Sequence, residues 1–183
     1  ARAVGEPLLE LPLAACGRAD LPHPPPHMPR NYALARAVLS GLEAAFPGAA
    51  AALDALPPGA LAIPGRFERA AAPDGRPVIY DVAHTPLSLA AVVAAFREGF
   101  RRCERGVVLA LRRDKDFEAI RRALPPRPAG ERWWTAPAGD HPESADPVAL
   151  AAAFDAEPLA RPEFPPGPEV LLVTGSAYLV GSL

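Results

Sequence analysis

Several residue types are scarce in this sequence of 183 residues, and each scarcity excludes a class of protein. Only two cysteines are present, Cys16 and Cys103, so neither a disulfide framework nor a paired-cysteine metal site is available. The absence of a run of about 18 apolar residues excludes a membrane-spanning helix. The first residues, ARAVGEP, lack the charged and apolar regions of a signal peptide. These absences predict a cytoplasmic protein.

An excess of charge of either sign is also missing. The chain has 19 basic and 21 acidic residues and a net charge of −2, which argues against a nucleic-acid-binding protein and against a basic membrane-surface segment. At 50% hydrophobic residues, the chain can nevertheless bury a core. We expect a monomer that binds small molecules, with no nucleic-acid or membrane partner.

Lysine, asparagine and glutamine have almost disappeared from the sequence. Lys115 is the only lysine among the 19 basic residues, Asn31 is the only asparagine, and glutamine is absent. Together with 25 prolines, this bias indicates a GC-rich coding sequence. A residue type that survives once against such a bias is either kept for its chemistry or left over by chance. Both interpretations of Lys115 and Asn31 stay open at this point.

The pattern of apolar segments changes near residue 60. Before that point we predict a strand, a proline-rich loop and two helices, over residues 7–14, 17–29, 31–46 and about 49–56. One strand and two helices cannot form a domain alone. We therefore interpret residues 1–60 as the C-terminal remnant of a larger domain.

From residue 61 to residue 183, predicted strands and helices alternate. Apolar runs predict strands over 77–82, 106–111, 132–135 and 169–173. Helical spacing or composition predicts helices over 86–102, 117–124 and 147–154, and a last apolar segment covers 177–180. Thr85 and Pro86 are a suitable N-cap and first helical residue. The alternation predicts an α/β fold with three layers and a Rossmann-like, mostly parallel sheet.

Polar residues follow the predicted strands where each one ends. Asp81 and His84 follow the first, Asp114–Asp116 with the lone Lys115 follow the second, and the turn Thr174–Ser176 follows the last. Because open α/β sheets bind ligands at the carboxyl ends of their strands, these residues predict one polar rim. Its groups suit a ligand that bears phosphate or carboxylate.

Each of these residues also has a purely structural interpretation. Asp81 can accept backbone N–H groups in a strand-to-helix turn, His84 can be satisfied within its own turn, and Asp114–Asp116 can cap a helix. His23 and His27 lack a third ligand at a suitable spacing, so we predict no metal site in this chain. The sequence also lacks a glycine-rich phosphate loop, so it can supply only part of an ATP site.

Four motifs, in this order and spacing, point to a family. They are PGRFE at 64–68, DVAHTP at 81–86, DKD at 114–116 and VTGSAYLVG at 173–181. Together they resemble the C-terminal domain of folylpolyglutamate synthase/dihydrofolate synthase, a branch of the Mur ligase superfamily. The upstream segment HMPRNYA, at 27–33, is similar to the segment that closes the central ATPase domain of that family.

The resemblance divides the chain into a central-domain remnant, residues 1–60, and a glutamate ligase domain, residues 61–183. It implies a ligase in which ATP phosphorylates a carboxylate of dihydropteroate or a folate, and the amine of L-glutamate then displaces phosphate from the acyl phosphate. The phosphate loop and the Mg²⁺ ligands of the family lie upstream of the part matched here. We therefore expect this chain to be inactive alone and to need its own N-terminal ATPase domain.

Matching motifs also assign roles to individual residues. The resemblance implies that Asn31, Arg66 and Asp81 contact ATP, with Arg66 facing phosphate and Asp81 facing ribose. It implies that His84 and Ser176 bind glutamate. The catalytic residues expected on this basis are Arg66, His84 and Lys115, and Arg66 would stabilise charge on the transferring phosphoryl group.

Two alternative functions stay open. The sequence Ala83-His84-Thr85-Pro86 is also similar to muramyl-tripeptide ligases of the same superfamily, although their Asp-Asn-Pro-Arg motif is absent. A stand-alone module that binds nucleotide or amino acid would keep the rim without the reaction. Only four residues separate Phe164 from Glu169, so the crossover before the last strand is expected to lack the helix that the family places there.

Overall fold

The computed structural model describes residues 27–56 and 63–183. It places two helices in the first range, α1 (His27–Gly41) and α2 (Ala49–Asp54), which contact each other. The predicted strand at 7–14 lies outside the described residues. Helix α1 begins inside the segment expected to be a loop, because Pro29 falls in a first helical turn, where its missing N–H group costs nothing.

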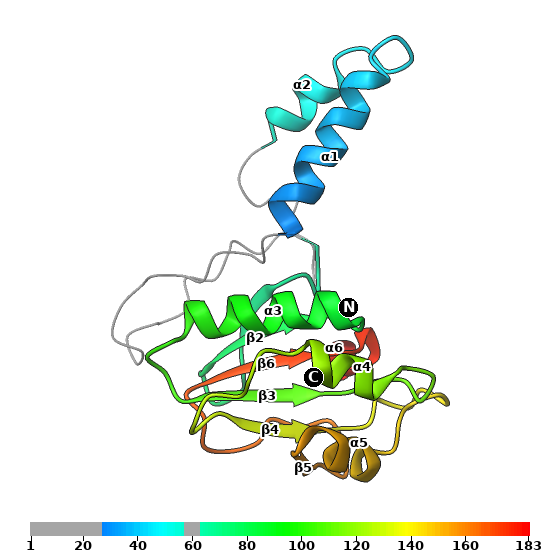
Figure 1. Cartoon of the computed structure of the whole chain (residues 1–183). Coiled ribbons are helices and arrows are strands. Elements are labelled where there is room, and N and C mark those ends of the chain that lie inside the picture. Colours follow the sequence, from blue (N-terminus) through cyan, green and yellow to red (C-terminus); the bar gives the residue numbers. More distant parts are fainter. Residues whose placement is uncertain (1–26, 57–62) are drawn as a thin grey trace.

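A six-stranded sheet forms the centre of the second range (Figure 1). Its strands are β1 (Glu68–Ala71), β2 (Pro77–Asp81), β3 (Arg105–Leu109), β4 (Arg132–Thr135), β5 (Glu157–Pro158) and β6 (Val170–Thr174). Their order is β1-β2-β6-β3-β4-β5. Only β1 runs antiparallel to its neighbour, and the other pairs are parallel. The predicted mostly parallel α/β fold is confirmed.

Helices and irregular segments cover both faces of this sheet. One face packs against α3 (Pro86–Gly99), α4 (Phe117–Ala123) and α5 (Pro147–Phe154). The other face packs against α6 (Ala177–Ser182) and against Leu159 and Phe164. Every residue of β2 and β6 is buried, which explains their unbroken apolar runs.

The connection from β5 to β6 covers its part of the sheet without a helix. As expected, residues 159–169 contain no helix, and all of them belong to the described part of the chain. Leu159 and Phe164 pack on the sheet in its place. The two tryptophans of β4 face opposite sides of the sheet, and both are buried in a core. Neither indole face is therefore available to a ligand.

Helix α3 begins as its sequence predicts. The Thr85 hydroxyl accepts the N–H group of Ser88 at 3.3 Å, and the Ser88 hydroxyl accepts the N–H group of Thr85 at 3.1 Å. This capping box satisfies two of the free N–H groups at the start of the helix. The helix ends at Gly99, slightly before the predicted end. The same capping principle applies at α4, where Asp116 accepts the N–H group of Ala119 at 2.9 Å.

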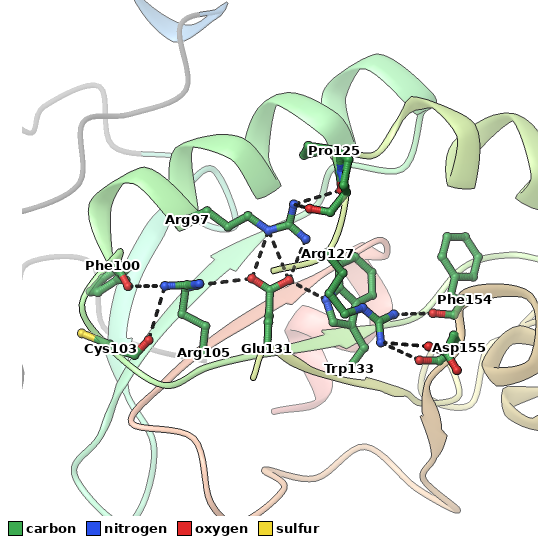
Figure 2. Close-up of polar contacts among 11 residues, drawn as sticks. Arg97, Phe100, Cys103, Arg105, Pro125, Arg127, Glu131, Trp133, Phe154 and Asp155 are labelled. Atoms are coloured by element: carbon green, nitrogen blue, oxygen red, sulfur yellow. Dashed lines mark hydrogen bonds and ion pairs between the residues drawn. The ribbon is translucent and has the colours of Figure 1, made fainter. Parts of the chain in front are cut away.

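A buried ionic cluster holds α3 against the amino ends of β3 and β4 (Figure 2). The fully buried Glu131 carboxylate binds Arg97 at 2.7 Å and Arg105 at 3.3 Å. It also accepts the indole N–H group of Trp133 at 2.8 Å. Burial by itself raises the pKa of Glu131, but the hydrogen bonds from Arg97, Trp133 and Arg105 outweigh it and hold the pKa below its usual value. The cluster lies at the edge opposite the predicted rim.

Candidate active site at the carboxyl edge of the sheet

The carboxyl ends of the central strands meet at one level of the sheet. Asp81 at the end of β2 lies beside Thr174 at the end of β6, and Thr174 lies beside Leu109 at the end of β3. Because β1 runs the opposite way, its first residues reach this same edge. The segment before β1 therefore joins the loops that follow the parallel strands, and it carries Arg66.

A tight turn before β1 presents Arg66. Gly65 and Phe67, on either side of it, both have positive φ angles, 69° and 50°. The turn is fastened to the end of β2, because Gly65 accepts the N–H group of Val82 at 2.9 Å. The Arg66 side chain is exposed and makes no hydrogen bond or ion pair with any other described residue. Its guanidinium is thus free to bind a phosphate.

The Asp81 carboxylate is buried and binds two backbone groups. One oxygen accepts the N–H group of Phe67 and the other accepts that of Ala83, both at 2.8 Å. Asp81 thus accepts backbone N–H groups in a turn, which is the structural role that the sequence also allowed for it. A contact with ribose stays a prediction. In this geometry Asp81 also fixes the turn that carries Arg66.

His84 is exposed just beyond β2, and its ring is oriented by a backbone carbonyl. Nδ1 lies 2.9 Å from the carbonyl oxygen of Val82, which can only accept a hydrogen bond. Nδ1 therefore carries the proton, and in the neutral ring Nε2 keeps its lone pair. His84 offers an acceptor, or base, to the rim.

The turn after β6 approaches its neighbour β3 very closely. Gly175 has φ 95°, and a Cβ atom there would lie 2.1 Å from the carbonyl oxygen of Ala110. Only glycine fits such a position. The hydroxyl of Ser176, which is buried, accepts the N–H group of Tyr178 at 3.2 Å. Within the described residues, Thr174 Oγ1 is the buried side-chain oxygen or nitrogen that has no hydrogen-bond partner. A buried hydroxyl without a partner costs free energy unless a water or a ligand binds it.

Lys115 lies in the turn after β3, and its ammonium group is only loosely paired, at 3.9 Å from Asp114. The structure thus brings Arg66, Asp81, His84, Lys115 and Ser176 to one edge of the sheet. The sixth predicted residue, Asn31, is exposed on α1, whose described packing partner is α2.

Sequence reasoning missed two residues of this edge, His141 and Tyr178. Their ring centroids lie 4.0 Å apart. His141 belongs to the loop that follows β4, and Tyr178 lies just after Ser176. Two signals were available: residues 136–145 follow a predicted strand of the parallel sheet, and Tyr178 lies within the motif VTGSAYLVG.

Among the described residues, no group of three histidine, cysteine or acidic side chains is arranged to hold a metal ion. Within the same residues, no helix is long and apolar enough to cross a bilayer.

Comparison with known proteins places the chain in a family. Residues 65–174 match the family model of the Mur ligase glutamate ligase domain. The match covers more than half of the sequence, so the chain belongs to this family. The predicted resemblance to the C-terminal domain of folylpolyglutamate synthase is confirmed. No curated protein gives a significant match.

Solved structures of similar fold include several folylpolyglutamate synthases. The folylpolyglutamate synthase of Mycobacterium tuberculosis complexed with ADP and AMPPCP has a TM-score of 0.66 and 25% identity, over 88% of this chain and 40% of its own. E. coli FolC in complex with DHPP and ADP has a TM-score of 0.54 and 19% identity, and the match covers 73% of this chain and 36% of FolC. A bifunctional folylpolyglutamate synthase/dihydrofolate synthase with Mn, AMPPNP and L-glutamate bound has a TM-score of 0.53 and 22% identity. That match covers 67% of this chain and 31% of the other. This chain spans well under half the length of each.

Proposed function

We propose that this chain is the C-terminal part of an ATP-dependent ligase that joins L-glutamate to dihydropteroate or to a folate. Family membership and the similar structures support the class. The observation that carries the proposal is the meeting of Arg66, His84 and Ser176 at one edge of the sheet. His84 and Ser176 follow the parallel strands β2 and β6, and the reversed direction of β1 brings Arg66 to the same edge. They supply a free cation, a basic nitrogen and a hydroxyl, which are the groups that this reaction needs.

The proposed reaction has two steps. In the first, the acceptor carboxylate attacks the γ-phosphorus of ATP, which gives an acyl phosphate and ADP. In the second, the amine nitrogen of glutamate attacks the carbonyl carbon, the C–O bond to phosphate breaks, and an amide and inorganic phosphate form. Arg66 fits the charge on the transferring phosphoryl group. His84 Nε2 can accept the proton that the amine loses, and Lys115 adds a second cation to the edge.

We further propose that residues 1–60 belong to the ATP-binding domain and residues 61–183 to the glutamate ligase domain. Helix α1 supports this division, since Leu34 and Val38 on the helix and Leu42 just beyond its end lie four residues apart and are 65%, 51% and 44% exposed. Such an apolar stripe on a helix usually faces a core. The upstream domain would cover it and would supply the phosphate loop and the Mg²⁺ ligands.

The test is a ligation assay with the longer protein that contains this chain. The protein is incubated with ATP, Mg²⁺ and L-glutamate, and with dihydropteroate, a reduced folate or the dipeptide substrate of muramyl ligases. Mass spectrometry measures the product, and ADP and phosphate are counted against it. We expect one glutamate added and one ADP formed per amide, with dihydropteroate or folate only. Ligation to the muramyl substrate would favour the other branch of the superfamily, and ligand binding without turnover would favour a binding module.

A further inference from the structure

The loop that follows β4, residues 136–145, is held firmly at the carboxyl edge. Its two ends bind the extension of β3, because the N–H groups of Ala136 and Ala145 donate to the carbonyl oxygens of Leu109 and Leu111 at 3.0 and 2.9 Å. Inside the loop, the Ser144 hydroxyl accepts the N–H group of Ala138 at 2.8 Å. Its one histidine is therefore carried on an ordered frame.

The hydrogen bonds of His141 fix which ring nitrogen carries the proton. The backbone N–H group of Glu143 donates to His141 Nδ1 at 3.1 Å. An N–H group can only donate, so Nδ1 keeps its lone pair and the proton is on Nε2. Within the described residues, that Nε2–H group makes no hydrogen bond. This arrangement is the reverse of His84, where Nδ1 carries the proton and Nε2 is the free acceptor.

The ring of Tyr178 contacts the ring of His141. The two rings are 4.0 Å apart at 50°, and Tyr178 is 54% exposed, so the pair lies at the surface of the edge. The N–H group of Tyr178 donates to Ser176, the residue expected to hold glutamate. The nearby Glu143 carboxylate pairs with Arg112 at 2.5 Å, and the same guanidinium also binds Asp114 at 3.2 Å.

We propose that His141 binds a carboxylate of the amino-acid substrate through its Nε2–H group, with Tyr178 holding the ring in place. The inference rests on the proposed function and adds a specificity-determining residue to it. A carboxylate accepts hydrogen bonds and donates none, so it matches a fixed donor. His84 offers the opposite group, an acceptor, which suits the amine.

The kinetic test uses the same longer protein and separates substrate binding from loop stability. A hydrogen bond to a charged group contributes about 1.5–3 kcal/mol, so His141→Ala is expected to raise KM for L-glutamate roughly 10- to 100-fold and to leave KM for ATP unchanged. His141→Gln, which keeps an N–H group near the position of Nε2, is expected to recover part of this loss. Tyr178→Leu is expected to raise KM for glutamate less than His141→Ala does. Tyr178→Phe, which keeps the aromatic ring, is expected to have the KM for glutamate of the unsubstituted protein. The exposed Glu118→Gln serves as the matched control.

A merely structural role for the pair predicts a different pattern. It would lower the melting temperature of His141→Ala and change KM for ATP and for glutamate by the same factor, or change neither. That outcome would overturn the inference and leave the proposed function intact.

A second measurement does not need the ligation reaction. In the isotope-labelled chain, imidazole ¹⁵N shifts report which nitrogen is protonated, and His141→Gln assigns the signal. We expect His141 to be protonated at Nε2 and its signal to move in a saturable way with L-glutamate. A signal that does not respond to L-glutamate would overturn the inference. If the longer protein has no ligase activity while this signal still responds, the proposed function fails and the amino-acid site stands.

Discussion

The carboxylate of Asp81 accepts the backbone N–H group of Phe67, 14 residues earlier in the chain, at 2.8 Å. The bond joins the end of a central strand to the turn that carries Arg66. A change at Asp81 is therefore transmitted through the backbone to a cation of the proposed active site. Asp81 is a positioning residue in this geometry, whether or not it also contacts ribose.

Replacing Asp81 is expected to disturb this turn. Asp81→Asn leaves one of the two backbone N–H groups facing an amide NH₂ group, and an unsatisfied buried donor costs about 1–3 kcal/mol. Urea denaturation of this chain measures the loss, with the exposed Asp74→Asn as control. In the longer protein, Asp81→Ala is expected to raise KM for ATP far more than KM for glutamate. Equal rises in both KM values would reject the nucleotide role.

Removal of the Arg66 side chain is expected to affect catalysis and leave stability unchanged. The guanidinium binds nothing among the described residues, so Arg66→Ala should leave the urea midpoint of this chain where it is. In the longer protein, loss of one charge-stabilising donor should lower turnover by roughly 10²–10³. A decrease in kcat/KM below about threefold would contradict its assignment to the phosphoryl group.

Glu131 is expected to control stability and its dependence on pH. Glu131→Gln leaves Arg97 and Arg105 buried without their anion, which should cost about 3–5 kcal/mol. The matched control is Glu118→Gln, whose ion pairs with Arg121 and Arg122 are exposed to solvent and should contribute little to stability. Because folding lowers the pKa of Glu131, its contribution is complete above the pKa of the unfolded chain and is lost as the pH falls through the folded value. The difference between wild type and Glu131→Gln should therefore shrink in acid. A gap that stays constant down to pH 3 would be inconsistent with this account.

The two glycine turns at opposite edges give a paired test of packing. Gly175 and Gly130 both have positive φ, 95° and 81°, so alanine at either carries a strain of about 1 kcal/mol or more. Only at Gly175 would the new Cβ collide, with the backbone of Ala110, because the space around Gly130 is open. Gly175→Ala should lower the melting temperature much more than Gly130→Ala. Similar losses for the two variants would show that β3 and the turn after β6 can move apart.

The exposed stripe on α1 provides a test of the proposed division into domains. Val38→Glu should leave the stability of this chain unchanged and should destabilise the longer protein, where the upstream domain would cover the stripe. Ser40→Glu, on the same helix but outside the stripe, is the control. If Val38→Glu has the same effect in both proteins, the stripe is not covered by that domain.

Much of the fold could be predicted from the sequence because its central elements carry strong local signals. The buried runs of β2, β3 and β6, and the Thr85–Pro86 start of α3, are readable without tertiary information. Strand β1, with the sequence ERAA, carries no such signal, since only its pairing with β2 makes it a strand. The two-residue strand β5 likewise carries no local signal in the sequence.

The candidate site divides in the same way. Residues that follow apolar strands could be assigned to the rim because strand direction alone places them there. Contacts between loops could not be predicted, since His141 and Tyr178 are far apart in the sequence and neither lies in a motif that specifies the other. The hydrogen bond between Asp81 and Phe67 could not be predicted either, because it also joins two separate segments of the chain.

The burial of β2 and β6 on both sides also limits how this domain can change over evolutionary time. A substitution in those strands must fit a packed interior, so its main effect is on the stability of the fold and not on the chemistry of the site. In the loops after the strands, this constraint applies to the buried residues, such as Ala138 and Gly175, and not to the exposed ones. Mutations that alter the preferred substrate should therefore accumulate at exposed loop positions such as Asp140 and Pro142, while the strands that support them stay the same.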